Sequence, residues 1–318
     1  MDASTLTEQL PYCITETHLS EWGTRYEGKV RDTYRDGDTL TLVTTDRISS
    51  FDHVLPQAIP FKGQVLNQLA AFFFKETADV FPNHIQAVPD PNITVGTACT
   101  PIPIEVVVRG YLAGHAARVY ESGARTLCGQ PLPDGLREGE QLPEPIVTPA
   151  TKAESGHDED IAPDEAISQG LVDAETYATL EEAALALFAR GTEIAAARGL
   201  ILVDTKYEFG RDTTGQLRLI DEVHTPDSSR YYEASSYAER LSQGKPQRQL
   251  SKEFVREWLM DQGFRGRDGD TMPDMPDRFR VEIAQRYIDL YERLTDRSFK
   301  AQVTPNPEER MRANLNVA

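Results

Sequence analysis

Two segments decide the fold of this chain, LVDTKYEFG (202–210) and LRLIDEVHTPDSSR (217–230), which are joined by a short polar connection. Side chains in a strand point to alternate faces. The first segment therefore predicts a strand with a polar face made of Asp204, Lys206 and Glu208. The turn residues DTTG (212–215) predict an antiparallel hairpin. Its second strand is expected to present a face made of Leu219, Asp221 and Val223.

This predicted hairpin carries three carboxylates and one lysine at its centre: Asp204, Glu208, Asp221 and Lys206. Like charges on a sheet repel one another, so the group requires a counter-charge, either a divalent cation or Lys206. Mg²⁺ takes one or two carboxylates and completes its shell with water and phosphate oxygens. A solvated outer face is the alternative for any charged strand. The following TPDSSR (225–230), with small hydroxyls and a guanidinium, favours an anion-binding turn.

Length and charge limit the possible functions. The 318 residues suggest two domains, expected as a β-rich part over 1–105 and a larger α+β part over 106–318. The net charge of −18 argues against nucleic acid or an anionic membrane as a partner. No apolar run approaches the ~20 residues that span a bilayer, and the start lacks a secretory signal. The widely spaced Cys13, Cys99 and Cys128 favour a reducing, cytoplasmic compartment.

The N-terminal part contains a first candidate phosphate site. YEGKVRDTY (26–34) reads as a strand interrupted by Gly28, and a second strand is expected over 39–44. A glycine beside Lys29 and Arg31 would let the backbone approach a phosphate, whereas an ordinary surface hairpin is the alternative. The loop TDRISSFD (45–52) lies directly after a strand, where binding groups are common, although an Asx or Ser turn would also explain it.

A second candidate anion site follows IEVVVR (104–109). This predicted strand ends at Arg109, and a helix is expected from Gly114 to about Ser122, whose N-terminus would favour an anion. His115 alone is more often a surface or capping residue than a catalyst. Residues 149–162 place Lys152 beside several acids, as either a solvated charge run or a substrate-binding loop.

Helical periodicity predicts further helices over 62–78, 173–198, 251–261 and 277–294. Asp173 is expected to cap the longest of them and Gly199 to end it. Ser251 is expected to cap the third, with Phe254 and Trp258 as its buried anchors. Residues 129–145 are expected to form a long loop, and the tail from Lys300 to run over the surface as a polar segment.

Seven segments together resemble the family of phosphoribosylaminoimidazole-succinocarboxamide synthases (SAICAR synthetases), which act in purine biosynthesis. Each motif alone is weak, but they span most of the chain in the family's order, so their joint agreement is specific. The segments are GKVRDTY (28–34), TTDRISSFD (44–52), KGQVLNQLAAFFF (62–74), VVVRGYLAG (106–114), TPATKAESGHDEDIA (148–162), DTKYEFG (204–210) and LIDEVHTPDSSRYY (219–232).

The resemblance implies a two-domain α+β fold with a kinase-like, ATP-grasp-like nucleotide cleft. It implies an ATP-dependent carbon–nitrogen ligase that condenses carboxyaminoimidazole ribonucleotide (CAIR) with L-aspartate, giving SAICAR, ADP and phosphate, with Mg²⁺. The implied partners are these small molecules, and either a monomer or a homodimer is compatible with it.

Residue roles are also implied by the resemblance. Gly28, Lys29 and Arg31 are expected to cover ATP. Glu208 and Asp221 are expected to hold Mg²⁺, with Asp204 and Lys206 close to the reacting groups. Arg109 and Arg230 are expected to meet the phosphate of the ribonucleotide. The other residues expected near the substrates are Asp46, Arg47, Ser49, Ser50, Asp52, Lys152, Ser228 and Ser229.

One position departs from the family's pattern. Many members have a serine where this chain has His115, and that serine is expected to contact the ribonucleotide phosphate. We expect His115 either to take over this contact or to turn to solvent while the backbone meets the phosphate.

The implied chemistry agrees with the residue types. A carboxylate forms an amide only after its oxygen becomes a good leaving group, which phosphorylation to an acyl phosphate achieves. The protein then needs cations around the phosphoryl group more than a covalent nucleophile. Two other hypotheses are a nucleotide-binding regulatory module without turnover and a small-molecule kinase with the same cleft. Consumption of ATP only when both other substrates are present would distinguish the ligase from them.

Overall fold

The computed structural model describes residues 1–152 and 159–317. Their contacts form two compact units, each described here by itself. The expected domain boundary near residue 105 stays a prediction, because these units are groups of contacting residues rather than independently folding pieces. The first unit contains Met1–Lys75, His84–Cys99 and Lys252–Ala318, and the second contains Glu76–Asn83 and Thr100–Ser251.

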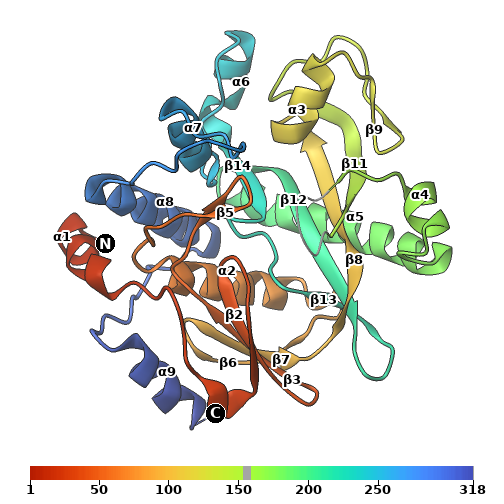
Figure 1. Ribbon diagram of the computed structural model, residues 1–318. Coiled ribbons are helices and arrows are strands. Elements are labelled where there is room, and N and C mark those ends of the chain that lie inside the picture. The colour runs from red at the N-terminus through yellow and green to blue at the C-terminus, as the bar shows by residue number, and fades with distance from the viewer. Residues whose placement is uncertain (153–158, 318) are drawn as a thin grey trace. The chain divides into compact units, whose positions relative to one another are not determined.

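The first unit is built on an antiparallel five-stranded sheet, visible in Figure 1. Helix α2 (Lys62–Glu76) confirms the predicted amphipathic helix, and its Asn67 accepts hydrogen bonds from Thr44 and Thr94 of the sheet. In spatial order the strands are β1 (Thr24–Glu27), β2 (Arg31–Asp36), β3 (Thr39–Thr44), β7 (Ile93–Thr97) and β6 (Ile85–Asp90). The short strands β4 (Ser49–Ser50) and β5 (His53–Val54) form a separate hairpin.

The prediction of one interrupted strand over 26–34 is wrong. Strands β1 and β2 form an antiparallel hairpin in which Glu27 lies opposite Asp32. The Gly28 amide donates to the Arg31 carbonyl at 2.8 Å, which closes the turn and reverses the chain.

Helices complete the first unit. Helix α7 begins at Glu253 with Lys252 as its N-cap, so the prediction that Ser251 caps it is wrong by one position. Its buried residues are Val255 and Leu259, whereas the predicted anchors Phe254 and Trp258 are half-buried and pack against Phe279. The remaining helical elements are α1 (Ala3–Gln9), η1 (Leu10–Tyr12), η2 (Ser20–Trp22), α7 (Glu253–Asp261), α8 (Asp277–Thr295) and α9 (Pro307–Leu315).

The tail was expected to run over the surface as a polar segment. It instead ends in helix α9. Met311 and Leu315 are four residues apart on this helix and pack into the core of the first unit. Arg310 donates to both carboxylate oxygens of the buried Asp90, at 2.9 and 3.0 Å. The polar composition of the tail hid this pair of apolar residues.

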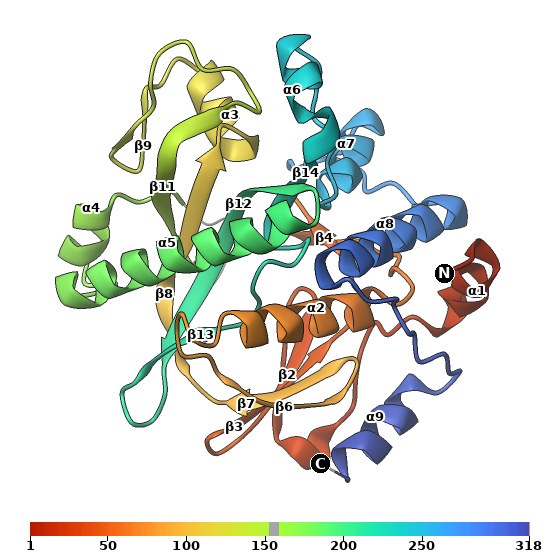
Figure 2. The same cartoon turned by 180° about the vertical axis from the view of Figure 1, so that it is seen from behind.

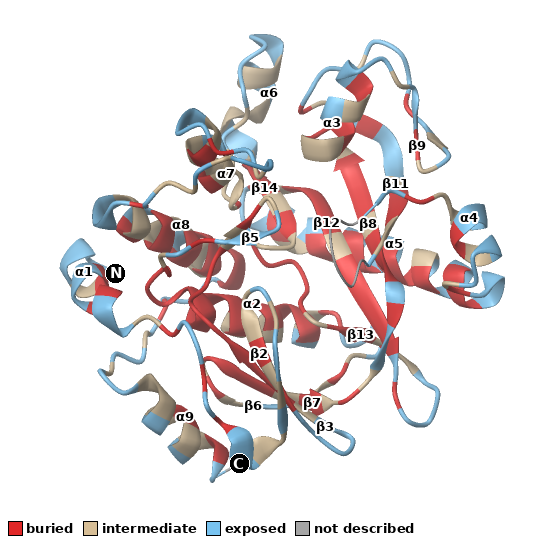
Figure 3. Ribbon diagram, in the orientation of Figure 1, coloured by how far each residue is buried: buried red, intermediate tan, exposed pale blue. Residues whose placement is uncertain are grey.

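The second unit is built on another antiparallel sheet. Helix α5 (Ala174–Ala197) crosses one face of it, as Figure 2 shows, and Asp173 caps this helix as predicted by accepting from the Thr176 amide at 2.8 Å. Gly199, with φ of +69°, follows the end of α5. The strands are β11 (Gln141–Thr151), β8 (Thr100–Tyr111), β12 (Leu200–Arg211) and β13 (Leu217–Ile220), with β14 (Ser229–Glu233) paired to β12. Figure 3 shows that β8 and β12 are largely buried.

Strand β11 corrects the prediction of a loop over 129–145, because it begins at Gln141 and lies at the edge of the sheet. Proline is tolerated in an edge strand, whose outer amides need no ladder partner. Further elements of this unit are α3 (Gly114–Glu121), α4 (Pro163–Ser168), α6 (Ala234–Ser242) and the hairpin of β9 (Thr126–Leu127) with β10 (Gln130–Pro131).

The predicted hairpin of β12 and β13 is confirmed, with Glu208 opposite Ile220. Asp212 closes its turn by accepting from the amides of Thr214 and Gln216. The second strand is shorter than expected and ends at Ile220, since Asp221 has a left-handed backbone with φ of +63°. Strand alternation therefore does not set the direction of Asp221, and Val223 lies outside the strand.

Cys13, Cys99 and Cys128 are all free thiols. Among the helices that the structure describes, none combines the length and the apolar character required to cross a bilayer.

Candidate active site

The pairing of β8 with β12 builds the first cluster of the second unit. It places Glu105 directly opposite Glu208, and each of the two residues is only 8% exposed. Lys206 Nζ lies 2.5 Å from Glu105 Oε1 and 3.4 Å from Glu208 Oε1. Lys152 Nζ pairs with the other oxygen of Glu208. Two ammonium groups thus hold together carboxylates that would otherwise repel one another.

Both lysines of this cluster are held in the charged form. Burial opposes the ammonium of Lys206, but the neighbouring Glu208, Glu105 and Asp221 outweigh it and raise its pKa. The pKa of Lys152 is likewise raised, because Glu208 outweighs the burial of its ammonium. A lysine that stays protonated cannot take a proton from an amine, so the two side chains are suited to neutralising negative charge.

The carboxylates of this cluster have the chemistry of a magnesium site. Their oxygens are the donors that Mg²⁺ prefers, and one or two protein carboxylates suffice where phosphate oxygens complete the shell. The charge of Asp221 also helps to raise the pKa of both Lys206 and Lys152. Within residues 1–152 and 159–317, no group of three or more His, Cys, Asp and Glu side chains is arranged to hold a metal ion by itself.

A second cluster lies on the same strand, around Asp204. This residue is opposite Arg109 on β8 and Arg230 on β14, and it is 3% exposed. Its Oδ2 is 2.7 Å from Arg230 NH1 and 3.5 Å from Arg109 NH1. Arg109 Nε also donates to Thr148 Oγ1 at 2.8 Å. One carboxylate therefore holds two guanidinium groups together, and the charge of Asp160 also acts on Arg109.

The start of α3 approaches this arginine pair. A Cβ atom added at Gly114, where φ is +54°, would collide with the guanidinium of Arg230, so the close approach requires glycine. The next residue, His115, places Nε2 2.6 Å from Asp160 Oδ2 and remains 43% exposed. This hydrogen bond lowers the pKa of Asp160, and the charge of Arg109 acts in the same direction.

The residues TPDSSR (225–230) form a turn, and their expected binding of an anion stays a prediction. The amides of Ser228 and Ser229 donate to the Thr225 carbonyl at 3.2 and 2.9 Å. Ser229 Oγ lies 2.7 Å from Thr205 Oγ1, and the Lys206 amide donates to the Ser228 carbonyl. These bonds tie the turn to β12 beside both clusters.

The first unit holds the other predicted site residues. Lys29 Nζ lies 2.6 Å from Asp52 Oδ1, and Arg31 begins β2. Asp46 is buried and accepts from the amides of Ile14 and Gly63, each at 2.8 Å, while burial raises its pKa to about 6. Ser49 and Ser50 pair with Val54 and His53 in the hairpin of β4 and β5. The roles of these residues toward substrates stay predictions.

Several residues that the structure brings into these groups were not predicted: Glu105, Thr148 and Asp160. In the first unit, Asp32 was not predicted either, and it accepts from Arg47 NH2 at 2.8 Å. Glu105 had a signal, because it is the one charged side chain inside the apolar run 104–108. The others depend on pairings that are distant in sequence. Residues 153–158 of the predicted substrate-binding loop lie outside the described part of the chain.

Comparison with known proteins shows the family of this chain. The pattern of the SAICAR synthetase family matches residues 24–270. A phosphoribosylaminoimidazole-succinocarboxamide synthase of Bacteroides thetaiotaomicron is 57% identical over 306 residues, which cover 95% of this chain and 97% of that protein. The chain belongs to the SAICAR synthetase family. It is a carbon–nitrogen ligase of purine biosynthesis, joining L-aspartate to CAIR with conversion of ATP to ADP and phosphate.

Other members of the SAICAR synthetase family agree in sequence and in fold. The enzyme of Legionella pneumophila is 47% identical over 302 residues, or 94% of this chain and 96% of that protein. A structure of the Saccharomyces cerevisiae SAICAR synthase with SAICAR has a TM-score of 0.78 and 34% identity, covering 91% of this chain and 100% of that one. A SAICAR synthetase in complex with ADP has a TM-score of 0.68 and 28% identity, covering 87% and 100%.

Proposed function

We propose that one face of β12 divides the substrates of the ligation between its two clusters. Glu208 and Lys206, with Asp221, bind the metal and the transferred phosphoryl group. Asp204 holds Arg109 and Arg230 for the phosphate of CAIR. The observation that supports this division is the alternation of β12, which puts Asp204, Lys206 and Glu208 on one face of the strand.

Glu208 and Asp221 would hold Mg²⁺ in this scheme. When bound, the ion would neutralise negative charge on the phosphates of ATP. Lys206 stays an ammonium beside Glu208 and adds a second positive charge, directed at the CAIR carboxylate as it becomes an acyl phosphate. The carboxylate neighbours of Lys206 and Lys152 raise both pKa values, which favours a role in neutralising negative charge over a role as the base for the amine of aspartate.

The loop 28–31 of the first unit binds ATP in this proposal, through the backbone at Gly28 and the charges of Lys29 and Arg31. The family's kinase-like nucleotide cleft is part of the proposal. The ADP complex of a related SAICAR synthetase supports the use of ATP. A requirement for ATP favours a cytoplasmic location, as expected from the free cysteines.

His115 acts at the phosphate end in this proposal. Its Nε2 is engaged by Asp160, which orients the imidazole at the start of α3, next to the position where Gly114 approaches Arg230. The other ring nitrogen then faces the phosphate of CAIR as the family's serine would.

A phosphate-release assay with one component omitted at a time tests the reaction type. Phosphate release at the full rate is expected only when ATP, Mg²⁺, CAIR and L-aspartate are all present. Rapid release without aspartate would favour a small-molecule kinase or an ATPase. Nucleotide binding without any release would favour the regulatory module.

A further inference from the structure

The backbone carbonyls of the loop 28–31 accept hydrogen bonds from residues of the first unit. Arg47 NH2 donates to the Gly28 carbonyl at 2.9 Å, and Arg47 Nε donates to the Lys29 carbonyl at 3.1 Å. Thr45 donates to the Val30 carbonyl through its amide at 3.1 Å and through Oγ1 at 2.8 Å. The Arg31 carbonyl accepts from the Gly28 amide. Four consecutive carbonyl oxygens are thus directed to donors of the protein.

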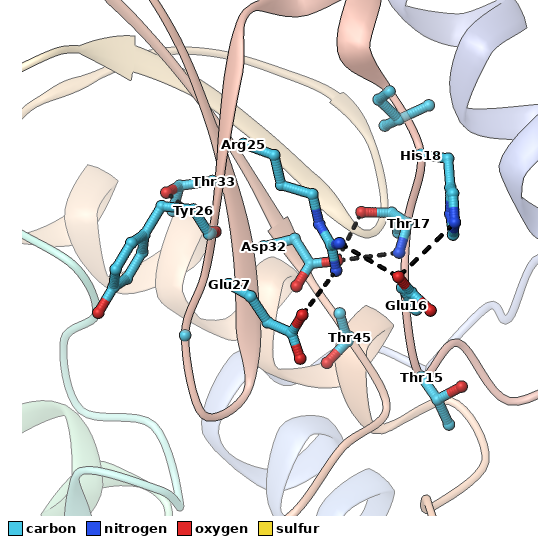
Figure 4. Close-up of polar contacts among 12 residues, drawn as sticks. Thr15, Glu16, Thr17, His18, Arg25, Tyr26, Glu27, Asp32, Thr33 and Thr45 are labelled. Atoms are coloured by element: carbon cyan, nitrogen blue, oxygen red, sulfur yellow. Dashed lines mark hydrogen bonds and ion pairs between the residues drawn. The ribbon is translucent and has the colours of Figure 1, made fainter.

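Arg47 is itself held in place. Its side chain is 7% exposed, NH1 donates to the Thr15 carbonyl at 2.6 Å, and NH2 donates to Asp32 Oδ1 at 2.8 Å. Asp32 is fully buried and also accepts from Thr17 and Arg25. Figure 4 shows the Asp32 carboxylate between Arg25 and Thr17. The guanidinium therefore connects a buried anion to two carbonyls of the loop.

From these contacts we infer that Arg47 is a positioning residue of the nucleotide loop, although its sequence motif suggested contact with a substrate. It acts by turning the carbonyl dipoles of Gly28 and Lys29 inward. A phosphate that approaches the loop then meets no carbonyl oxygen from these residues. Among the residues that the structure describes, the amides of Lys29 and Val30 donate to no acceptor and would be available to it. This inference rests on the proposed role of the loop in binding ATP.

The shape of the guanidinium explains why arginine is required. Its planar fork carries five N–H donors and reaches Gly28, Lys29, Thr15 and Asp32 at once. A lysine has a single ammonium nitrogen and cannot serve carbonyls placed on two sides of the fork. Arg47→Lys is therefore expected to keep the ion pair with Asp32 but to lose part of the loop geometry.

Arg25 offers a matched control for this inference. It donates to the other oxygen of Asp32 at 3.1 Å, as well as to Glu16 and Glu27, but not to a carbonyl of the loop. Arg47→Met should raise KM for ATP by roughly tenfold or more, as expected for lost hydrogen bonds that orient a binding loop. Arg47→Lys should fall between Arg47→Met and the parent. In Arg25→Met, KM for ATP should change by no more than about twofold. In every one of these variants, KM for L-aspartate should also stay within about twofold of the parent value.

Hydrogen exchange of the amides over 28–31, measured without any nucleotide, tests directly whether Arg47 orders the backbone of the loop. Faster exchange in Arg47→Met than in Arg25→Met is expected, and equal exchange would overturn the inference. Thr45→Val, which removes one hydroxyl donor to Val30, gives a milder variant if Arg47→Met does not fold. It should raise KM for ATP more than Thr45→Ser, and equal values would overturn the inference as well.

Lys29→Ala distinguishes the two levels of the proposal. If Lys29→Ala raises KM for ATP and Arg47→Met does not, the positioning role of Arg47 is wrong while the nucleotide loop stands. If neither variant raises it, the proposed role of the loop fails, and the inference drawn from it fails too.

Discussion

Glu105 on β8 lies directly opposite Glu208 on β12, and the two carboxylates share the ammonium of Lys206, at 2.5 and 3.4 Å. Two buried like charges at facing positions of a sheet are destabilising unless a cation lies between them. Lys206 supplies that cation within the sheet. Glu105 in turn holds Lys206 closer to itself than to Glu208, so Lys206 does not pair tightly with Glu208 Oε1.

Glu105→Gln should therefore weaken the response to Mg²⁺. Without the charge of Glu105, Lys206 moves toward Glu208 and competes with the ion for its oxygen. The Mg²⁺ concentration for half-maximal activity is expected to rise by roughly tenfold or more, as for one lost charged hydrogen bond. Glu121→Gln, at the exposed end of α3, serves as the control in the same titration. An unchanged Mg²⁺ response in Glu105→Gln would contradict this role.

Asp221→Asn should lower kcat by about 10²-fold or more, because an amide keeps the shape of the side chain but removes the charge of a metal ligand. Circular dichroism should show the fold unchanged. Asp134→Asn changes an exposed carboxylate of the same unit and should leave kcat as in the parent. Near-normal turnover of Asp221→Asn with the same Mg²⁺ requirement would rule out Asp221 as a ligand.

Asp160 and His115 should behave as a pair. If Asp160 orients His115 toward the phosphate of CAIR, then Asp160→Asn and His115→Ala should each raise KM for CAIR and leave KM for ATP nearly unchanged. The double variant should be no worse than the poorer single variant, since both act through the imidazole. His115→Ser should recover part of the loss. Additive effects would indicate that the two side chains act independently.

Burial raises the pKa of Asp46 to about 6 from an ordinary value of 3.8. Between these two values the folded protein binds more protons than the unfolded chain, so stability should fall as pH rises from about 4 to 6 and then level off. The shift corresponds to about 3 kcal/mol at most. Urea unfolding at several pH values should show this fall in the parent and a flatter profile in Asp46→Asn. The same slope in both proteins would assign the dependence to other groups.

The sequence was sufficient for features that depend on local periodicity. Alternation over 202–210 predicted the polar face of β12, and the spacing of apolar residues with Asp173 and Gly199 predicted α5 and both its ends. The family motifs then named Arg109 and Arg230 together, and the structure places both at Asp204.

Other features depend on register or on packing at long range and could not be read from the sequence. Glu105 meets Lys206 only because β8 pairs with β12 in one particular register. Arg47 donates to the Gly28 carbonyl at the hairpin turn between β1 and β2. In the sequence this turn looks like an interruption of a single strand, so the contact could not be predicted. The burial of Met311 depends on a core made by residues far earlier in the chain.

Calorimetric titration of Lys29→Ala and Arg230→Ala with Mg²⁺–ADP and with CAIR tests the division of the substrates most directly. Lys29→Ala should weaken the binding of Mg²⁺–ADP and leave the affinity for CAIR unchanged. Arg230→Ala should weaken the binding free energy of CAIR by roughly 1.5–3 kcal/mol, as expected for one lost charged hydrogen bond. It should leave the affinity for the nucleotide unchanged. If the two effects are interchanged, or if each variant weakens both ligands equally, the assignment of ATP to the loop 28–31 and of CAIR to the arginine pair is wrong.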